Sequence, residues 1–156
     1  MGQALSTCAV IAALLPFASA GGPAVAEGAL AVGSTARIDR DGIAVGTAIN
    51  YETIEEARDA ALQQCREYRP APKAANRCMI VATFKDQCYG VAFDPKAGTP
   101  GAGWAIALTQ SMAEQRALDQ CRATAGKSRK KFCSIIEAKC DGSQTIALRQ
   151  NGGTHD

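Results

Sequence analysis

The chain has 156 residues, a formal net charge of +2 and a hydrophobic fraction of 47%. This length allows one domain, or two at most, and the hydrophobic fraction is that of an ordinary globular protein, which argues against a disordered chain. The small net charge argues against nucleic-acid binding, since such proteins carry a strong excess of lysine and arginine.

The N-terminal segment has the pattern of an export signal. An apolar run over residues 8–17 precedes two groups of small residues, which end at Ala20 and Ala26. This order predicts a signal peptide over residues 1–26, cleaved after one of these alanines. The alternative is a buried N-terminal helix, because no lysine or arginine precedes the run. The run is too short to cross a bilayer, so we expect no transmembrane segment in the mature chain and a secreted or periplasmic location.

Beyond this segment the chain reads as one duplicated domain over residues 27–142, with copies at about 28–87 and 88–142. Each copy has the order strand, strand, helix, strand, because short runs of β-branched, aromatic and small apolar residues are separated by Gly- and Pro-containing turns. The predicted strands are 28–33, 43–49 and 78–84 in the first copy, and 88–93, 104–108 and 132–138 in the second. Residues 144–148 are a further candidate edge strand, in a tail over 143–156 that we expect to be loosely ordered.

The two predicted helices carry the repeat. At one constant offset, Ala57, Ala61, Leu62, Gln64 and Cys65 fall on Ala113, Ala117, Leu118, Gln120 and Cys121. Apolar residues at three- and four-residue steps predict a helix with one buried face, and alanines on that face allow close packing on a β-sheet. A hydroxyl followed three residues later by glutamate predicts helix starts at Thr53 and Ser111, which makes the second helix the shorter one.

These elements predict an α+β fold. We expect about six strands in an antiparallel or mixed sheet, with two helices packed on it and disulfides that stabilise it. Signal cleavage removes Cys8 and leaves Cys65, Cys78, Cys88, Cys121, Cys133 and Cys140. An even set in an exported chain predicts disulfides, because an oxidising compartment lets them persist. No two are spaced as Cys-x-x-Cys, which argues against a zinc ribbon or a thioredoxin-like redox site.

The repeat also selects a disulfide pairing. In each copy one cysteine ends the helix and the next opens the following strand, so equivalent positions should form equivalent bonds. The predicted pairs are Cys65–Cys78, Cys121–Cys133 and Cys88–Cys140. We expect the last of these to lock the two copies together across a pseudo-twofold axis. A Cys78–Cys88 bond is disfavoured, since a short turn near residues 85–87 would place Cys88 beside Phe84 instead.

The paired Ala-x-x-x-Ala-Leu-x-x-Cys helices, the small apolar strands and the cysteine that opens the strand after each helix resemble a bacterial family called domain of unknown function 4189. The resemblance covers roughly residues 28–140. It implies an exported, disulfide-bonded α+β domain from a family without an assigned activity, and it supplies no catalytic residues.

No residue set in the chain predicts catalysis. The single histidine, His155, lies in a Gly- and Asn-rich tail, and disulfide-bonded cysteines are not nucleophiles. The acidic residues near Glu55 suit the first turn of a helix. We therefore expect no enzyme, cofactor or metal site. The favoured function is an exported binding protein whose partner is another protein or an envelope component. The alternative is a secreted effector or small hydrolase that acts on envelope or host-cell targets.

A few residues are candidates for contact with that partner. They are Trp104, Tyr89 and the basic residues Lys127, Arg129, Lys130 and Lys131. Each has a competing structural interpretation. Tryptophan more often packs in a core than contacts a ligand, and a short basic run is usually a solvated turn.

Overall fold

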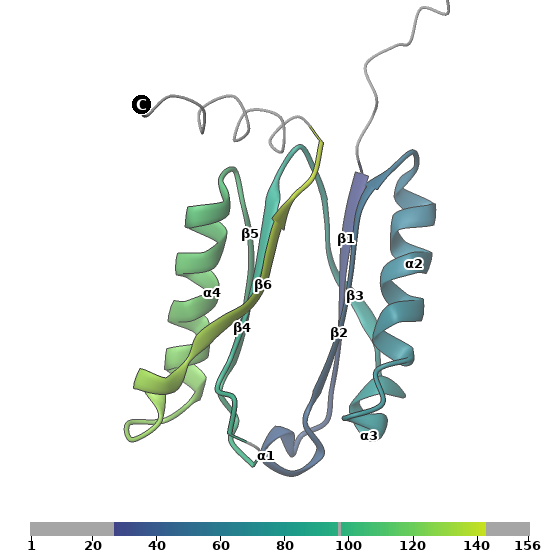
Figure 1. The fold of residues 1–156 in the computed structure, drawn as a ribbon. Helices are drawn as coiled ribbons and strands as arrows, with labels where there is room; N and C mark the ends of the chain where they lie inside the picture. The colour runs from purple at the N-terminus through teal and green to yellow at the C-terminus, as the bar shows by residue number, and fades with distance from the viewer. Residues whose placement is uncertain (1–26, 97, 143–156) are drawn as a thin grey trace, which may run out of the picture.

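The computed structural model describes residues 27–96 and 98–142, which form two three-stranded antiparallel sheets that face each other, each with a long helix on its outer side (Figure 1). The first half contains β1 (Glu27–Ser34), α1 (Ile38–Asp41), β2 (Ile43–Tyr51), α2 (Ile54–Arg66), α3 (Pro72–Ala75) and β3 (Met79–Lys85). The second contains β4 (Cys88–Phe93), β5 (Ala102–Ala107), α4 (Gln110–Thr124), the 3₁₀ helix η1 (Lys130–Phe132) and β6 (Ser134–Cys140).

The α+β class and the six strands are confirmed, but the strands form two sheets rather than one. Their orders are β2-β1-β3 and β5-β4-β6, so each half pairs only with itself. The reason lies in the two apolar faces of each sheet. One face is covered by α2 or α4, and the other packs against the opposite sheet. The centre of this second interface is formed by Leu30, Phe84, Tyr89 and Val91, all buried.

Small residues bring each long helix close to its sheet. The buried face of α2 consists of Ala57, Ala61 and Cys65, and that of α4 of Ala113, Ala117 and Cys121. Opposite them lie Gly46 and Gly103, where a Cβ atom would collide with the carbonyl oxygen of Ala61 or Ala117. Only glycine fits at these two positions, because the helix backbone occupies the space of a side chain.

The first helix starts where the sequence predicts, and the second does not. The Thr53 hydroxyl accepts a hydrogen bond from the Glu56 amide at 3.3 Å, which caps α2. In α4 the cap is Thr109, whose hydroxyl accepts from the Met112 amide at 3.3 Å. The predicted start at Ser111 is therefore wrong, because that residue already lies within the helix. As a result α4, with 15 residues, is longer than α2, with 13.

The structure contains the three predicted disulfide pairs. Two of them, Cys65–Cys78 and Cys121–Cys133, each have a Cα–Cα distance of 6.0 Å and fasten a long helix to the segment that leads into the last strand of its half. The third pair, Cys88–Cys140, joins directly opposed residues of β4 and β6, with a Cα–Cα distance of 3.9 Å. The expectation that this bond locks the copies together is wrong, because both strands belong to the second sheet.

The two halves are joined by the apolar interface and by polar contacts, one group of which involves Asn50. The Asn50 amide donates to Asp141 Oδ1 at 2.8 Å, and the Gly142 amide donates to Asn50 Oδ1 at 2.8 Å. Asn50 adopts a positive φ of 62°, which asparagine tolerates better than most residues. Asp141 is fully buried, and burial raises the pKa of its carboxyl group above the ordinary value.

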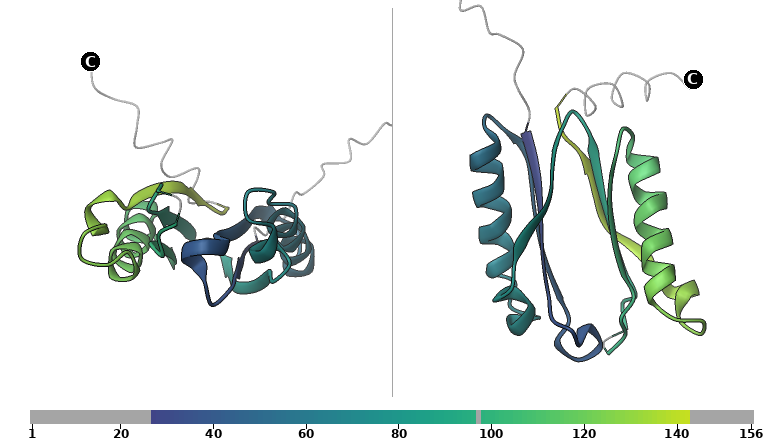
Figure 2. Two further views of the ribbon diagram at one scale, coloured as in Figure 1. Left: turned by 90° about the horizontal axis from the view of Figure 1, so that it is seen from below. Right: turned by 180° about the vertical axis from the view of Figure 1, so that it is seen from behind.

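Strands and helices run between two ends of the molecule, so the connections collect there (Figures 1 and 2). One end has the short turns after β2, β3 and β5. The other, which we call the loop end, has four long connections: residues 35–42, 67–78, the described part of 94–101, and 125–133. No helix in the described ranges is long and apolar enough to cross a membrane. The predicted signal peptide and the candidate strand 144–148 lie outside those ranges.

Candidate functional site

The structure separates the two aromatic candidates. Tyr89 is 1% exposed, and its hydroxyl donates to Thr47 Oγ1 at 3.2 Å. Burial raises the pKa of this phenol. Tyr89 as an exposed contact is therefore wrong, because β4 is the central strand of its sheet and this side chain packs between the sheets. Trp104 lies on the edge strand β5 and is half-buried, with part of its surface lining an open groove.

Within the basic run, the Arg129 side chain is held by contacts inside the protein. Its Nε donates to Asp94 Oδ2 at 2.7 Å, and its guanidinium lies 4.1 Å from the centre of the Phe132 ring. This arrangement ties the segment around η1 to the loop that follows β4. Lys127, Lys130 and Lys131 are exposed at the surface. Three lysines of the run, rather than all four basic residues, are thus available to a partner.

Asp94 is the buried end of that ion pair. The Arg129 guanidinium lowers the pKa of its carboxyl group to about 2, and the Lys96 amide adds a hydrogen bond to Oδ1 at 3.1 Å. The carboxylate is consequently charged at every ordinary pH. It fixes the shape of the β4–β5 loop rather than being free for proton transfer.

Asp41 plays the same part in the first half. Its carboxylate accepts a hydrogen bond from the Thr35 hydroxyl at 2.8 Å and from Lys73 Nζ at 3.2 Å, and Arg40 Nε lies 3.6 Å away. These contacts, the Thr35 bond first, hold the pKa of Asp41 below its usual value. They fasten α1 to α3. In each half, therefore, one carboxylate holds the loops of the loop end in place: Asp41 in the first half and Asp94 in the second.

A cleft of about 410 Å³ opens at the loop end between the two halves. The first half contributes α1 and residues near Tyr68, and the second contributes Phe93 and the β4–β5 loop. The rim carries the cations Arg40 and Lys96 beside the two braced carboxylates. Aromatic and charged groups thus converge in one concave surface, which is the usual composition of a binding site.

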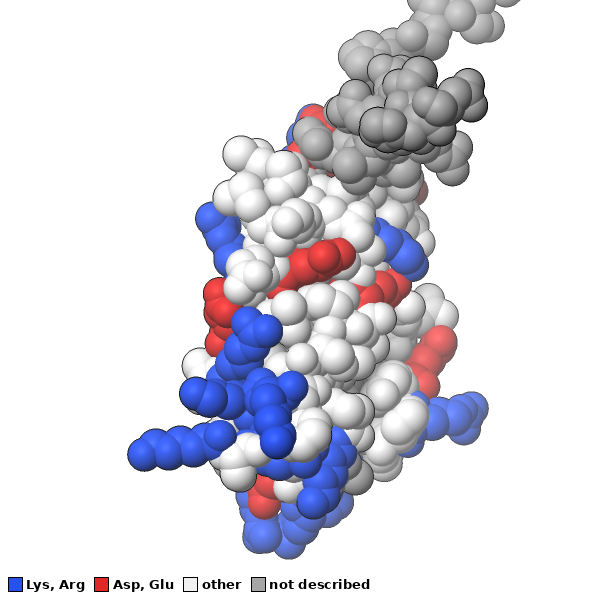
Figure 3. All heavy atoms as spheres, turned by 60° about the vertical axis from the view of Figure 1, so that its left-hand side comes forward, with Lys and Arg blue, Asp and Glu red and all other residues white. Residues whose placement is uncertain are grey.

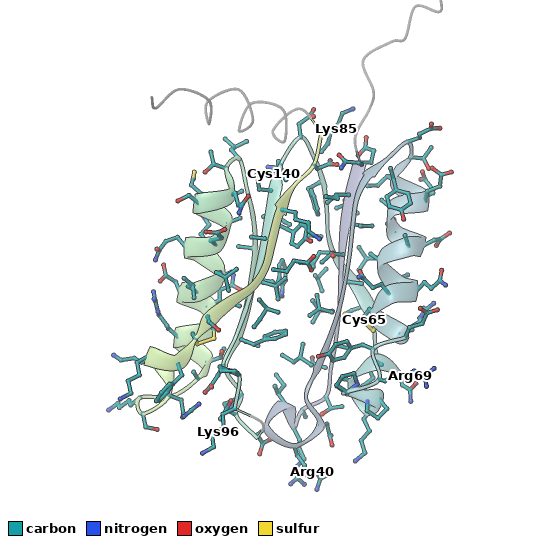
Figure 4. The ribbon with its side chains drawn as sticks, in the orientation of Figure 1. Arg40, Cys65, Arg69, Lys85, Lys96 and Cys140 are labelled. Atoms are coloured by element: carbon teal, nitrogen blue, oxygen red, sulfur yellow. A yellow bond between two sulfur atoms is a disulfide. The ribbon has the colours of Figure 1, made fainter. Side chains whose placement is uncertain are left out.

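Positive charge gathers around this cleft. The four long connections carry Arg37, Arg40, Arg69, Lys73, Arg77, Lys96, Lys127, Arg129, Lys130 and Lys131, against Asp39, Asp41, Glu67 and Asp94. The basic side chains form a visible concentration at this end in Figure 3, and Figure 4 shows Arg40, Arg69 and Lys96 there. The opposite turns carry Glu52 and Asp86, and Asp141 follows β6 at the same end. Both long helices direct their C-termini to the loop end, where cations are favoured by the helix dipole.

Most of this surface has no direct signal in the amino-acid sequence. The run at 127–131 is contiguous and therefore recognisable, but Arg40, Arg69 and Lys96 lie in separate connections and none of them stands out alone. The signal that could have revealed it is the order of the strands and helices along the chain. In an antiparallel strand-strand-helix-strand unit, alternate connections fall at the same end, so long basic loops at those positions must come together.

Comparison with known proteins identifies a family but adds no chemistry. Residues 28–140 match the family described as "Domain of unknown function (DUF4189)". No curated protein and no solved structure matches the chain.

Proposed function

Because this chain belongs to the DUF4189 family, whose description names no activity, we propose on the basis of its geometry that it is an exported, non-catalytic binding protein. Its loop end engages a negatively charged partner, either a protein or an envelope component. The observation that carries this proposal is the convergence of four long, predominantly basic connections from both halves around one cleft.

The disulfides support export. Bonds of this kind form and persist in oxidising compartments such as the periplasm or the extracellular space. Here three bonds use all six cysteines of the described residues. They suit a domain with few large core side chains, since cross-links limit the freedom of the unfolded chain. The equivalent placement of Gly46 and Gly103 against their helices supports an origin by duplication.

The lowered pKa values of the two carboxyl groups in the cleft support binding over catalysis. General acid–base chemistry near neutral pH needs a group whose pKa lies near that pH. Asp94 and Asp41 instead have lowered pKa values, because cations and hydroxyl groups hold both as carboxylates. The exposed lysines around them are suited to steering an anionic partner, an effect that weakens with added salt.

A charge-reversal pair tests the proposal. Lys127→Glu/Lys130→Glu changes two exposed lysines at the loop end, whereas Arg58→Glu/Lys85→Glu makes the same charge change at two exposed residues away from it, on α2 and at the end of β3. We expect the first variant to weaken binding to poly-L-glutamate and to a sulfated polysaccharide by about tenfold, equivalent to about 1.4 kcal/mol. The second variant should stay within about twofold of the wild type.

Binding is measured by titration calorimetry at low and high salt, with thermal unfolding as a check that both variants fold. Equal weakening in the two variants would mean that net charge alone is responsible. Absence of binding by the wild-type protein to both polyanions would contradict the proposal outright.

A further inference from the structure

A second concave surface lies away from the loop end. It is an open groove of about 610 Å³ between the edge strands β3 and β5, flanked by α4. These two strands are on the side that faces the viewer in the right-hand view of Figure 2. Ala82 and Thr83 line it from β3, Trp104 and Ile106 from β5, and Arg116 and Gln120 from α4.

The two halves of the molecule provide an internal comparison for this groove. Gly46 and Gly103 lie against equivalent backbone atoms of α2 and α4, so the next residues, Thr47 and Trp104, occupy equivalent positions. A second pair of contacts confirms the match. Gln64 Oε1 accepts from the Thr47 amide, and Gln120 Oε1 accepts from the Trp104 amide at 3.2 Å. Counting from Cys78 and Cys133, the counterpart of Ala82 is Glu137.

On the opposite side of the molecule, where β2 meets β6, polar side chains fill the corresponding space. The Thr47 hydroxyl contacts Glu137 Oε2 at 3.4 Å, the Tyr89 hydroxyl reaches Thr47 at 3.2 Å, and Lys139 Nζ lies 2.6 Å from Glu137 Oε1. On the groove side an alanine replaces the glutamate and a tryptophan replaces the threonine. The groove is therefore absent from the opposite side because two residues, Ala82 and Trp104, differ from their counterparts Glu137 and Thr47.

The groups around the groove define the ligand chemistry. Trp104 packs partly against the apolar interface between the sheets, and its exposed part contributes an aromatic surface to the groove. Arg116 and the Gln120 amide nitrogen are exposed and have no hydrogen-bond partner within the described ranges. Asp119 also lines the groove, but its carboxylate is already paired with Arg122 at 3.2 Å, so Arg116 is left to donate to hydrogen-bond acceptors of a ligand. The outward amides of β5 at Ala102 and Trp104 are already bonded to Thr124 and Gln120, so a peptide strand cannot be added along β5 at these residues.

We propose that this groove binds a saccharide segment, with a sugar ring stacked on Trp104 and its hydroxyl groups hydrogen-bonded to Arg116 and Gln120. A pyranose ring combines a flat C–H face with hydroxyl groups at its rim, and that combination matches an aromatic surface bordered by planar polar side chains. The site goes beyond the proposed function, because it uses none of the basic residues of the loop end.

The chain offers a direct probe, since Trp104 is its only tryptophan. The wild-type protein is titrated with β-1,4-linked oligomers of N-acetylglucosamine and of glucose, and with an uncharged extended peptide. We expect a saturable change in tryptophan fluorescence with at least one oligosaccharide and none with the peptide. Titration calorimetry supplies the affinities, so that the variants can be compared without relying on the fluorophore.

The decisive variant is Ala82→Glu, which places in the groove the residue found at the equivalent position of the other half. It should reduce saccharide affinity at least tenfold while thermal unfolding and polyanion binding stay unchanged. Trp104→Ala should abolish binding and Trp104→Phe should retain part of it. The control is Glu137→Ala, which alters the opposite side of the molecule and should leave the affinity unchanged.

Three results would overturn the proposal: no response to any of the oligosaccharides at millimolar concentration, wild-type affinity in Ala82→Glu, or saturable binding of the peptide alone. The last result would indicate strand addition at β3 instead. Because the polyanion assay depends on Lys127 and Lys130, failure here is distinguishable from failure of the proposed function.

Discussion

At the scale of single residues, buried ionic contacts decide the shape of the loop end. The Asp94 carboxylate has no exposed side-chain surface and is bonded to Arg129, which in turn stacks on Phe132. Removing one partner of such a pair leaves the other desolvated and unpaired, which costs more than the pair itself contributes. Arg129 is thus a positioning residue for the lysines on either side of it, although it belongs to the same basic run.

The first prediction concerns the pH dependence of this contact. The folded-state pKa of Asp94, about 2, is below the ordinary value of 3.8, so its stabilisation is present above pH 3.8 and is lost as the pH falls through 2. Asp94→Asn should therefore be less stable than the wild type at pH 7, and the difference should shrink between pH 4 and pH 2. Denaturant unfolding across this pH range measures it.

A matched control is Asp39→Asn, which makes the same change at an exposed aspartate of the same surface. It should alter stability little at any pH, as expected for a solvent-exposed charge. If Asp94→Asn behaved like this control at pH 7, the ion pair would have no structural role.

At the scale of elements, the distance between helix and sheet is set by glycine and alanine. Gly103 sits under the backbone of α4 near Ala117 and Cys121, and any side chain there must push the helix outward. Since Cys121 is bonded to Cys133, such a shift would also strain the link to the segment before β6.

We predict that Gly103→Ala destabilises the protein by about 3 kcal/mol or more, since overpacking against backbone cannot relax by rotation of a side chain. Gly126→Ala is the control. A Cβ at Gly126 meets nothing within 4 Å, and only its positive φ of 76° opposes alanine, at a cost of about 1 kcal/mol. Thermal or denaturant unfolding of both variants measures the difference. Equal losses would show that helix–sheet contact does not require glycine at position 103.

Local elements could be predicted from the sequence because their causes are local. Three- and four-residue apolar spacing determined the two long helices. The equivalent cysteines determined two disulfide pairs, which left Cys88 and Cys140 for the third. The assignment of strands to sheets could not be predicted, because pairing depends on which apolar faces meet after the helices have packed. The same limit applies to Tyr89, whose position on a central strand between two sheets is a property of the assembled fold.

At the scale of the whole molecule, antiparallel connectivity produces two ends of different character. Long basic connections from both halves collect at one end and short turns with acidic residues at the other. Such a charge distribution orients an approaching polyanion before contact, so salt should slow association more than it speeds dissociation. The edge of β5 and the Trp104 groove lie on a different surface, which leaves room for two ligands at once.

The measurement that tests the binding account most directly is hydrogen exchange of the wild-type protein with and without bound poly-L-glutamate. We predict slower exchange within the loop end, at residues 35–42, 67–78 and 125–133, and no change in the turns after β2, β3 and β5. Protection confined to those opposite turns, or to the outer faces of α2 and α4, would contradict the assignment of the loop end as the binding surface.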